Sequence, residues 1–263
     1  MFKKIGVDLG SERLRVYVRG EGLILDAPAA VAVSGPGPAV IGDAAVRLEG
    51  HTGVHVVWPV AAGVLTDVRA ASLLVEHAIA AGQGHQRLFR PEVVVCVPPA
   101  TGLRERWILT AAMVQAGPRQ AWLIDGPLAA AIGAGLPVAE RRACAVCDLG
   151  GGSVEVALLA RSGMIVWRGA ALALDGTGRT EAVAGLVRRT VAEAPDQVAA
   201  EVLADGLTLT GGGALQPGVA AELAALAGLP VRAAEDPHIC AARGAAQAPQ
   251  RFEVMRSGQA YIR

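Results

Sequence analysis

Residues 6–11 read Gly-Val-Asp-Leu-Gly-Ser, and residues 147–153 read Cys-Asp-Leu-Gly-Gly-Gly-Ser. Each stretch ends an apolar run and precedes an alternating segment, at residues 14–18 and 154–158. Strand, glycine turn and strand in that order predict a hairpin whose tip presents backbone N–H groups beside a carboxylate. Nucleotide phosphates and their Mg²⁺ bind such groups. Because the pattern occurs twice, with Asp8 and Asp148 separated by 140 positions, it predicts a duplicated nucleotide-binding fold.

A third glycine cluster, at residues 211–213, lies in a different setting. The β-branched run 207–210 predicts a buried strand before it, and a helix is expected after it, over 218–227. A glycine turn that leads into a helix offers N–H donors and the positive end of the helix dipole to an anion. Further strands are expected at 92–97 and 120–124, and further helices at 103–116, 127–134 and 237–246. Strands that alternate with helices predict α/β layers around a mixed sheet in each half.

In this order, the three loops resemble those of the actin-like ATPases. Four other stretches resemble segments of the MreB/Mbl family of bacterial cell-shape proteins: residues 58–67, 90–98, 126–138 and 234–237. The resemblance is colinear over most of the chain. It implies an α/β actin-like ATPase fold with duplicated ribonuclease-H-like halves, at residues 1–136 and 137–263. The small subdomain of the first half is expected at about 27–66.

One part of the family pattern is missing from this sequence. The family has a long insertion that forms the small subdomain of the second half, whereas residues 175–178 here lead almost directly into Arg179. We therefore expect that subdomain to be largely absent. Since it closes over the adenosine in the family, its loss leaves the phosphate contacts to hold the nucleotide.

The resemblance implies ATP and Mg²⁺ as ligands, with Asp8 and Asp148 holding Mg²⁺ through water. Ser11 and Ser153 are expected to hold the phosphates, together with these positions of the three loops: Gly10, Gly150, Gly151, Gly152, Gly211, Gly212, Gly213, Ala214 and Leu215. The first loop is unusual, because Glu12 repels phosphate and Arg13 attracts it. The sequence does not decide which of the two charges prevails. The alternative interpretation, that both motifs are hairpin turns that bind no ligand, also remains open.

The family places an acidic residue beside the position of Pro127, where it orients the attacking water. Residues 125–127 read Asp-Gly-Pro here. If the acid adjacent to proline is the one required, it has been lost at Gly126. If the earlier one is required, Asp125 is shorter than the family's glutamate and lies about 1 Å further away, which can cost ~10²-fold in rate. We therefore expect weak or absent ATP turnover, with Asp125 as the candidate acid.

Composition limits the possible partners. The chain has 24 basic and 24 acidic residues, and this balance argues against nucleic acid as a partner. Apolar residues make up 52% and the mean hydropathy is +0.41, yet no apolar run reaches the ~18–20 residues of a membrane span. The N-terminus shows no signal-peptide pattern, because Asp8 interrupts the apolar run. These features favour a cytoplasmic protein.

Leu88 and Phe89 correspond to the exposed hydrophobic loop that MreB-like proteins insert into the membrane. Arg87 and Arg90 beside them suit the interface of an anionic bilayer. Residues 1–4, Met-Phe-Lys-Lys, offer a second, weaker contact. The alternative is that the two apolar side chains pack against the start of the next strand.

Two functional interpretations remain. The preferred one is an ATP-binding cytoskeletal protein of cell shape or cell-wall morphogenesis, peripheral to the inner face of the cell membrane. Its partners would be itself or an MreB-like paralogue in a filament, and the cell-wall or division machinery. The alternative is a degenerate actin-fold adaptor that binds partner proteins without a nucleotide cycle. A small-molecule kinase of the same superfamily is disfavoured, because the chain offers no substrate domain.

Overall fold

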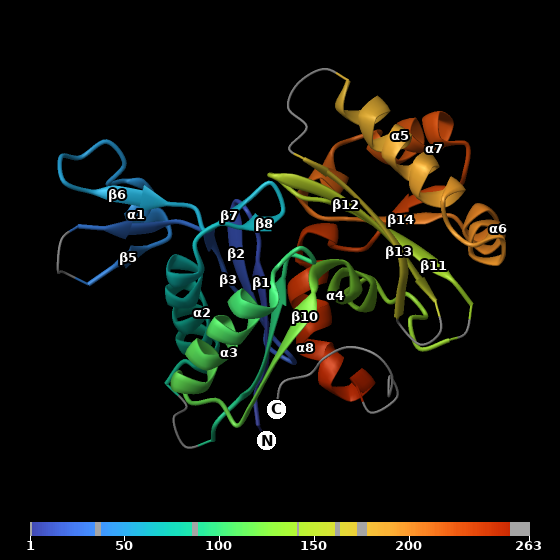
Figure 1. The fold of residues 1–263 in the computed structure, drawn as a ribbon. Helices are drawn as coiled ribbons and strands as arrows, with labels where there is room; N and C mark the ends of the chain where they lie inside the picture. Colours follow the sequence, from blue (N-terminus) through green and yellow to red (C-terminus); the bar gives the residue numbers. More distant parts are fainter. Residues whose placement is uncertain are drawn as a thin grey trace.

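The computed structural model describes residues 2–34, 38–85, 89–140, 142–160, 164–172 and 178–252. Two five-stranded sheets dominate the structure, in the orders β10-β9-β1-β2-β3 and β13-β12-β11-β14-β15 (Figure 1). Each sheet has an antiparallel three-stranded meander. A fourth strand runs parallel to the first strand of the meander, and a fifth runs parallel to the fourth. The identical topology confirms the predicted duplication.

The strands of the first sheet are β1 (Lys4–Leu9), β2 (Arg13–Val18), β3 (Gly22–Pro28), β9 (Glu92–Val97) and β10 (Gln120–Asp125). Those of the second are β11 (Cys144–Leu149), β12 (Ser153–Ala160), β13 (Met164–Leu172), β14 (Leu207–Thr210) and β15 (Val231–Ala233). β9 and β14 lie inside their sheets and are almost wholly buried. The continuous apolar run of β9 is typical of a strand that is covered on both faces, and in β14 the threonines Thr208 and Thr210 are buried together with the leucines.

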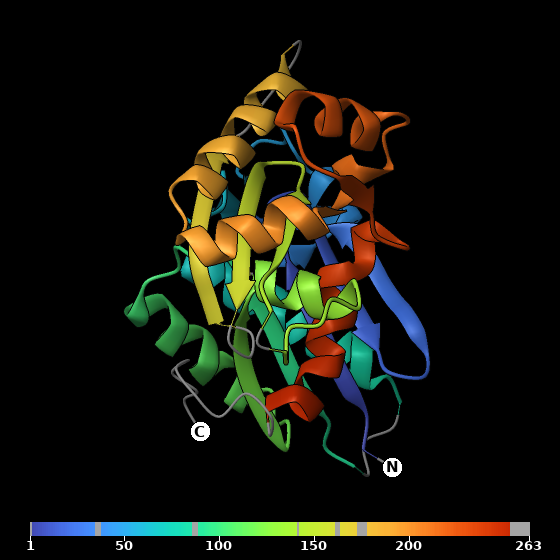
Figure 2. The same cartoon turned by 90° about the vertical axis from the view of Figure 1, so that its right-hand side faces the viewer.

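The helices form three layers around the two sheets. The outer face of the first sheet is covered by α2 (Val68–Gln83) and α3 (Leu103–Gln115). The outer face of the second is covered by α5 (Arg179–Ala192), α6 (Asp196–Asp205) and α7 (Val219–Ala227). Between the sheets lie α4 (Gly126–Gly133) and α8 (Cys240–Phe252), as Figures 1 and 2 show. The result is an α–β–α–β–α stack.

The α4–α8 pair is packed closely because glycines lie where the two helices cross. A Cβ atom on Gly133 would overlap the carbonyl oxygen of Cys240, and one on Gly244 would overlap that of Ala129. On the other side of α8, a Cβ atom on Gly6 would overlap the carbonyl oxygen of Ala242 in the same way. α8, the last helix of the described residues, therefore packs directly on β1.

A small subdomain projects from the first half within residues 31–65 (Figure 1). Its elements are β4 (Val31–Val33), β5 (Val40–Ile41), α1 (Asp43–Val46), β6 (His55–Val57), β7 (Val60–Ala61) and β8 (Val64–Leu65). In the second half, only six residues separate the end of β13 from the start of α5. That length cannot form a matching subdomain, and the predicted loss is confirmed.

Candidate phosphate-binding cleft

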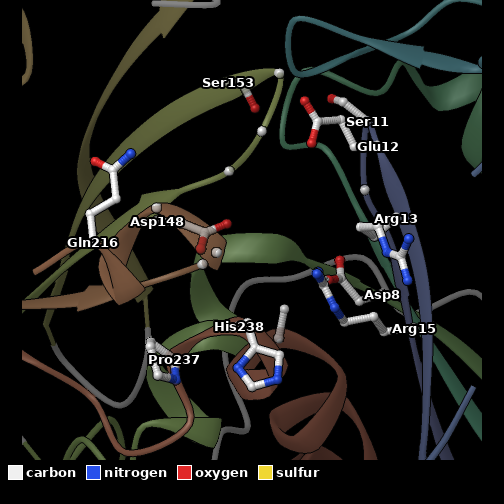
Figure 3. A pocket seen from close by; sticks show the side chains of 18 of the residues that line it. Asp8, Ser11, Glu12, Arg13, Arg15, Asp148, Ser153, Gln216, Pro237 and His238 are labelled. Atoms are coloured by element: carbon white, nitrogen blue, oxygen red, sulfur yellow. Dashed lines mark ion pairs between the residues drawn. The ribbon is translucent and has the colours of Figure 1, made fainter. Parts of the chain in front are cut away.

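A cleft of about 420 Å³ lies between the two halves, where the hairpin tips of both sheets face each other (Figure 3). Most of the predicted phosphate and Mg²⁺ residues line it: Asp8, Gly10, Ser11, Glu12, Arg13, Asp148, Gly150, Gly151, Gly152, Ser153, Gly211, Gly212 and Gly213. The lining also includes residues that the sequence did not identify: Arg15, Arg179, Gln216, Pro237, His238 and Ala241. The structure therefore brings the three glycine turns to one place.

Asp8 lies near the end of β1, and Arg15 of β2 is its cross-strand partner. The Oδ2 atom of Asp8 and the Nη1 atom of Arg15 are 3.7 Å apart, and both side chains are mostly buried. Burial raises the pKa of Asp8 to about 7; Arg15 opposes this shift, while Asp148 across the cleft adds to it. The ionised form of Asp8 is thus costly in this cleft.

Asp148 occupies the equivalent position in the second hairpin. The hydroxyl of Thr210, at the end of β14, donates a hydrogen bond of 2.9 Å to Asp148 Oδ1. Burial raises the pKa of Asp148 as well, against the effects of Thr210 and Arg15. Two buried carboxylates that face one cleft favour a proton or a cation near them.

Among the described residues, the side chains of the cleft do not form a complete metal site on their own. In the part of the chain that the structure describes, no group of three or more His, Cys, Asp or Glu side chains is placed to hold a metal. Asp8 and Asp148 therefore suit an ion whose other ligands are water and the phosphates of the nucleotide. Mg²⁺ usually binds in that way.

The first and second loops touch each other across the cleft. A Cβ atom on Gly151 would overlap the carboxylate of Glu12, and one on Gly152 would lie 2.7 Å from Ser11 Cβ. Figure 3 shows Ser11 and Glu12 together at the upper edge of the cleft. Glu12 thus brings a negative charge to the edge of the second glycine turn.

Arg13 does not offset that charge, because its guanidinium is engaged elsewhere. Its Nε atom donates to Asp26 Oδ1 and its Nη2 atom to the Asp26 carbonyl oxygen, both at 2.7 Å. The cation closer to the cleft carboxylates is Arg15. Its Nε atom lies 3.3 Å from Asp26 Oδ2 in an ion pair.

The third turn is glycine-rich because it packs against the second hairpin. Gly211 has φ +82°, and a Cβ atom there would lie 2.7 Å from Asp148 Oδ1. After it, residues 212–215 form a 3₁₀ turn, in which Ala214 is buried and Leu215 is exposed. Neither of these two predicted residues lines the cleft; Gln216 does.

Asp125 lies outside the cleft lining. Its Oδ1 atom pairs with Arg106 Nη2 of α3 at 2.5 Å, so the carboxylate is held toward α3. Next to it, Gly126 begins α4 in open surroundings, where a Cβ atom would have only the Val97 carbonyl oxygen nearby, at 3.8 Å. The position beside Pro127 therefore carries no acid, and a Cβ atom there would meet no clash.

Arg179 and His238 are two unpredicted lining residues of the second half whose contacts matter for the cleft. Arg179, at the start of α5, donates from Nη2 to the Gly150 carbonyl oxygen at 2.8 Å and so supports the second turn. His238 lies on the floor of the cleft between Pro237 and Arg15 (Figure 3). Its Nδ1 atom is buried and has no hydrogen-bond partner among the described residues.

The predicted membrane loop is only partly described, because Leu88 lies outside the described residues. Phe89 is 57% exposed, and its ring meets that of Phe2 edge-on, with centroids 5.9 Å apart. The guanidinium of Arg119 lies 4.5 Å from the centre of the Phe2 ring. None of the described helices is long and apolar enough to cross a bilayer.

Two sheets of the same topology, with a cleft between their hairpin tips, define an actin-like protein. The model of the MreB/Mbl protein family matches residues 2–189 and 177–257. The chain belongs to this family. The two matched segments overlap at residues 177–189, where the family insertion is expected.

Similar sequences support the same family. The chain is 27% identical to the cell shape-determining protein MreB of Escherichia coli over 330 aligned positions, which cover 95% of this chain and 94% of the relative. The alignment is longer than the 263 residues here, so the relative carries segments without a counterpart.

Solved structures show the same fold. MreB 5 of Spiroplasma citri, bound to AMPPNP, superimposes with a TM-score of 0.81 at 19% identity, over 96% of this chain and 97% of that one. The MamK double helical filament gives a TM-score of 0.71 at 16% identity, over 94% and 98%.

Proposed function

We propose that this chain is an ATP-binding cytoskeletal protein of cell shape or cell-wall morphogenesis. The observation that carries the proposal is the convergence of both Asp-Leu-Gly turns and the Gly211–Gly213 turn on one cleft. Such turns place backbone N–H donors and carboxylates around a phosphate chain and its Mg²⁺. The AMPPNP bound to the similar Spiroplasma protein supports an adenine nucleotide as the ligand.

Binding here depends mainly on the phosphates. The short connection between β13 and α5 leaves no subdomain to cover the adenosine. The pocket beside the cleft, between α5 and α7, has a volume of about 10 Å³, far less than an adenine ring needs. Tripolyphosphate should therefore compete with ATP nearly as well as ADP does.

Hydrolysis is weak or absent in this proposal. The position beside Pro127 is a glycine, and Asp125 is paired with Arg106 and lies outside the cleft lining. A bound ATP would then persist and act mainly as a structural ligand between the two halves.

The protein works at the cytoplasmic face of the membrane and in a filament, alone or with an MreB-like paralogue. Phe2 and Phe89 form one exposed aromatic pair, which brings the two predicted membrane segments together. A single pair of this kind binds weakly, so many copies are needed for stable contact. The filament formed by the similar MamK protein supports assembly.

The test is a titration with a fluorescent ATP analogue and Mg²⁺. Wild-type protein should bind saturably, and Asp148→Ala should lose binding. Asp196→Ala, an exposed carboxylate on α6, is the matched control and should bind as wild type does. If wild type does not bind at millimolar nucleotide, the alternative holds and the chain is an actin-fold adaptor without a nucleotide cycle.

A further inference from the structure

Arg15 is a cation inside the cleft that the phosphate-loop pattern does not require. It lines the cleft from β2, opposite Asp8 in the strand register, and its side chain is 15% exposed. Its position is fixed by Asp26 of the edge strand β3, whose Oδ2 atom lies 3.3 Å from Arg15 Nε. Figure 3 shows Arg15 beside Asp8 at the lower right of the cleft.

The hydrogen-bonding capacity of Arg15 is not used up by these carboxylates. Its Nε atom is buried and has no hydrogen-bond partner of good geometry in the described part of the chain. The contact with Asp8, at 3.7 Å, is an ion pair longer than a hydrogen bond. Asp26 is also shared, because it accepts the shorter bonds from Arg13. A guanidinium has five N–H donors, so Arg15 retains donors for a further anion.

We propose that Arg15 supplies a positive charge that neutralises the phosphates of a bound nucleotide. This cleft can then bind a nucleotide polyphosphate without Mg²⁺. The inference rests on the proposed nucleotide-binding function and specifies how the phosphates are neutralised. A guanidinium pairs with phosphate oxygens in two parallel hydrogen bonds, and it carries its charge at all physiological pH values. The competing explanation is structural: Arg15 merely joins β1 to β3 through Asp8 and Asp26.

The experiment measures the affinity for ATP by calorimetry in two buffers, one with Mg²⁺ and one with EDTA. The variants are Arg15→Leu, Arg15→Lys and the matched control Arg19→Leu. Arg19 directly follows the same strand but is exposed and lies outside the cleft lining. Thermal unfolding checks that each variant is folded. If Arg15→Leu does not fold, Arg15→Gln, a shorter side chain that keeps a polar hydrogen-bonding group but not the charge, takes its place.

Wild type should bind ATP in EDTA within about tenfold of its affinity in Mg²⁺. Arg15→Leu should bind at least about tenfold more weakly than wild type in EDTA, since charge-assisted hydrogen bonds are worth that much. Arg15→Lys should restore part of the loss, and Arg19→Leu should behave as wild type.

Two results overturn the inference alone: binding of wild type in Mg²⁺ but not in EDTA, or equal binding of wild type and Arg15→Leu in EDTA. Absence of wild-type binding in both buffers overturns the proposed function as well, so the two failures are distinguishable.

Discussion

Ser11 and Gly152 meet across the cleft: a Cβ atom on the glycine would lie 2.7 Å from the Cβ atom of the serine. The Ser11 Cβ atom is fixed by its backbone and cannot rotate away. Gly152→Ala should therefore force the two loops apart and lower the free energy of unfolding by about 1–3 kcal/mol, as overpacking does. Denaturant unfolding measures the change.

The neighbouring glycine provides the control. At Gly151 the atoms in the way belong to the carboxylate of Glu12, the far end of a flexible side chain. Gly151→Ala should thus stay within about 0.5 kcal/mol of wild type, as surface substitutions usually do. The double variant Ser11→Gly/Gly152→Ala should regain most of the lost stability; no recovery would show that the contact is not the cause.

The crossing of α4 and α8 should tolerate no side chain at Gly133. There the obstacle is backbone, the carbonyl oxygen of Cys240, which cannot move without shifting α8. We expect Gly133→Ala to destabilise the protein by about 3 kcal/mol or more. Gly185→Ala, in α5 with no atom closer than 3.7 Å, should instead stabilise by about 0.5–1 kcal/mol. Equal effects at the two sites in urea unfolding would contradict this account.

Stability should depend on pH through Asp8. Because its pKa is raised from 3.8 to about 7 in the folded protein, the folded state binds more protons than the unfolded state between these values. The free energy of unfolding should therefore decrease as pH rises from about 4 to about 7, by up to about 4 kcal/mol.

Asp8→Asn should reduce the slope of this part of the pH profile, with the contribution of Asp148 left in place, and raise stability at pH 8, while it weakens nucleotide binding. Asp196→Asn, at an exposed carboxylate, should leave the profile unchanged. An unaltered slope in Asp8→Asn would exclude Asp8 as its source.

Gly126→Glu should raise ATP turnover above the wild-type level. A Cβ atom at this position meets no clash, and a positioned acid or base contributes ~10²–10⁴-fold in favourable cases. Phosphate release under saturating ATP measures the rate. Gly126→Gln, with the same shape and no charge, should stay at the wild-type rate; background turnover in Gly126→Glu would count against the loss of an acid as the reason for weak hydrolysis.

Liposome flotation tests the membrane proposal. Leu88→Ser/Phe89→Ser and Phe2→Ser should each reduce binding to anionic vesicles, because Phe2 and Phe89 form one exposed pair. Leu203→Ser removes an apolar side chain of similar exposure from α6, in the other half, and should bind as wild type does. Equal flotation of all four proteins would refute the role of the aromatic pair.

The local parts of the fold were predictable. The strand at 92–97 and the turn at 211–213 depend on neighbours in sequence, and the structure has them where expected. The helix expected at 237–246 is instead a 3₁₀ turn at 237–239 followed by α8. The structure of this segment depends on contacts with residues far away in the sequence, because α8 packs on β1 and α4.

The missed cleft residues have the same explanation. Arg15 reads as an ordinary polar position of an alternating strand, and only the register of β1 with β2 places it opposite Asp8. Arg179 reaches Gly150 from a helix that begins 29 positions later. The turn length of a hairpin fixes which residues of its two strands are opposite each other, so Arg15 could have been identified as the partner of Asp8. No local pattern identifies Arg179.

The position of α8 also affects the order in which the chain folds during synthesis. The first sheet emerges early from the ribosome, but the face of β1 that carries Gly6 stays uncovered until α8 has been translated. Domains usually fold as units, N-terminal ones first. Here the N-terminal half is completed only by α8, so a nascent chain stalled before residue 240 would expose the face of β1 that α8 covers.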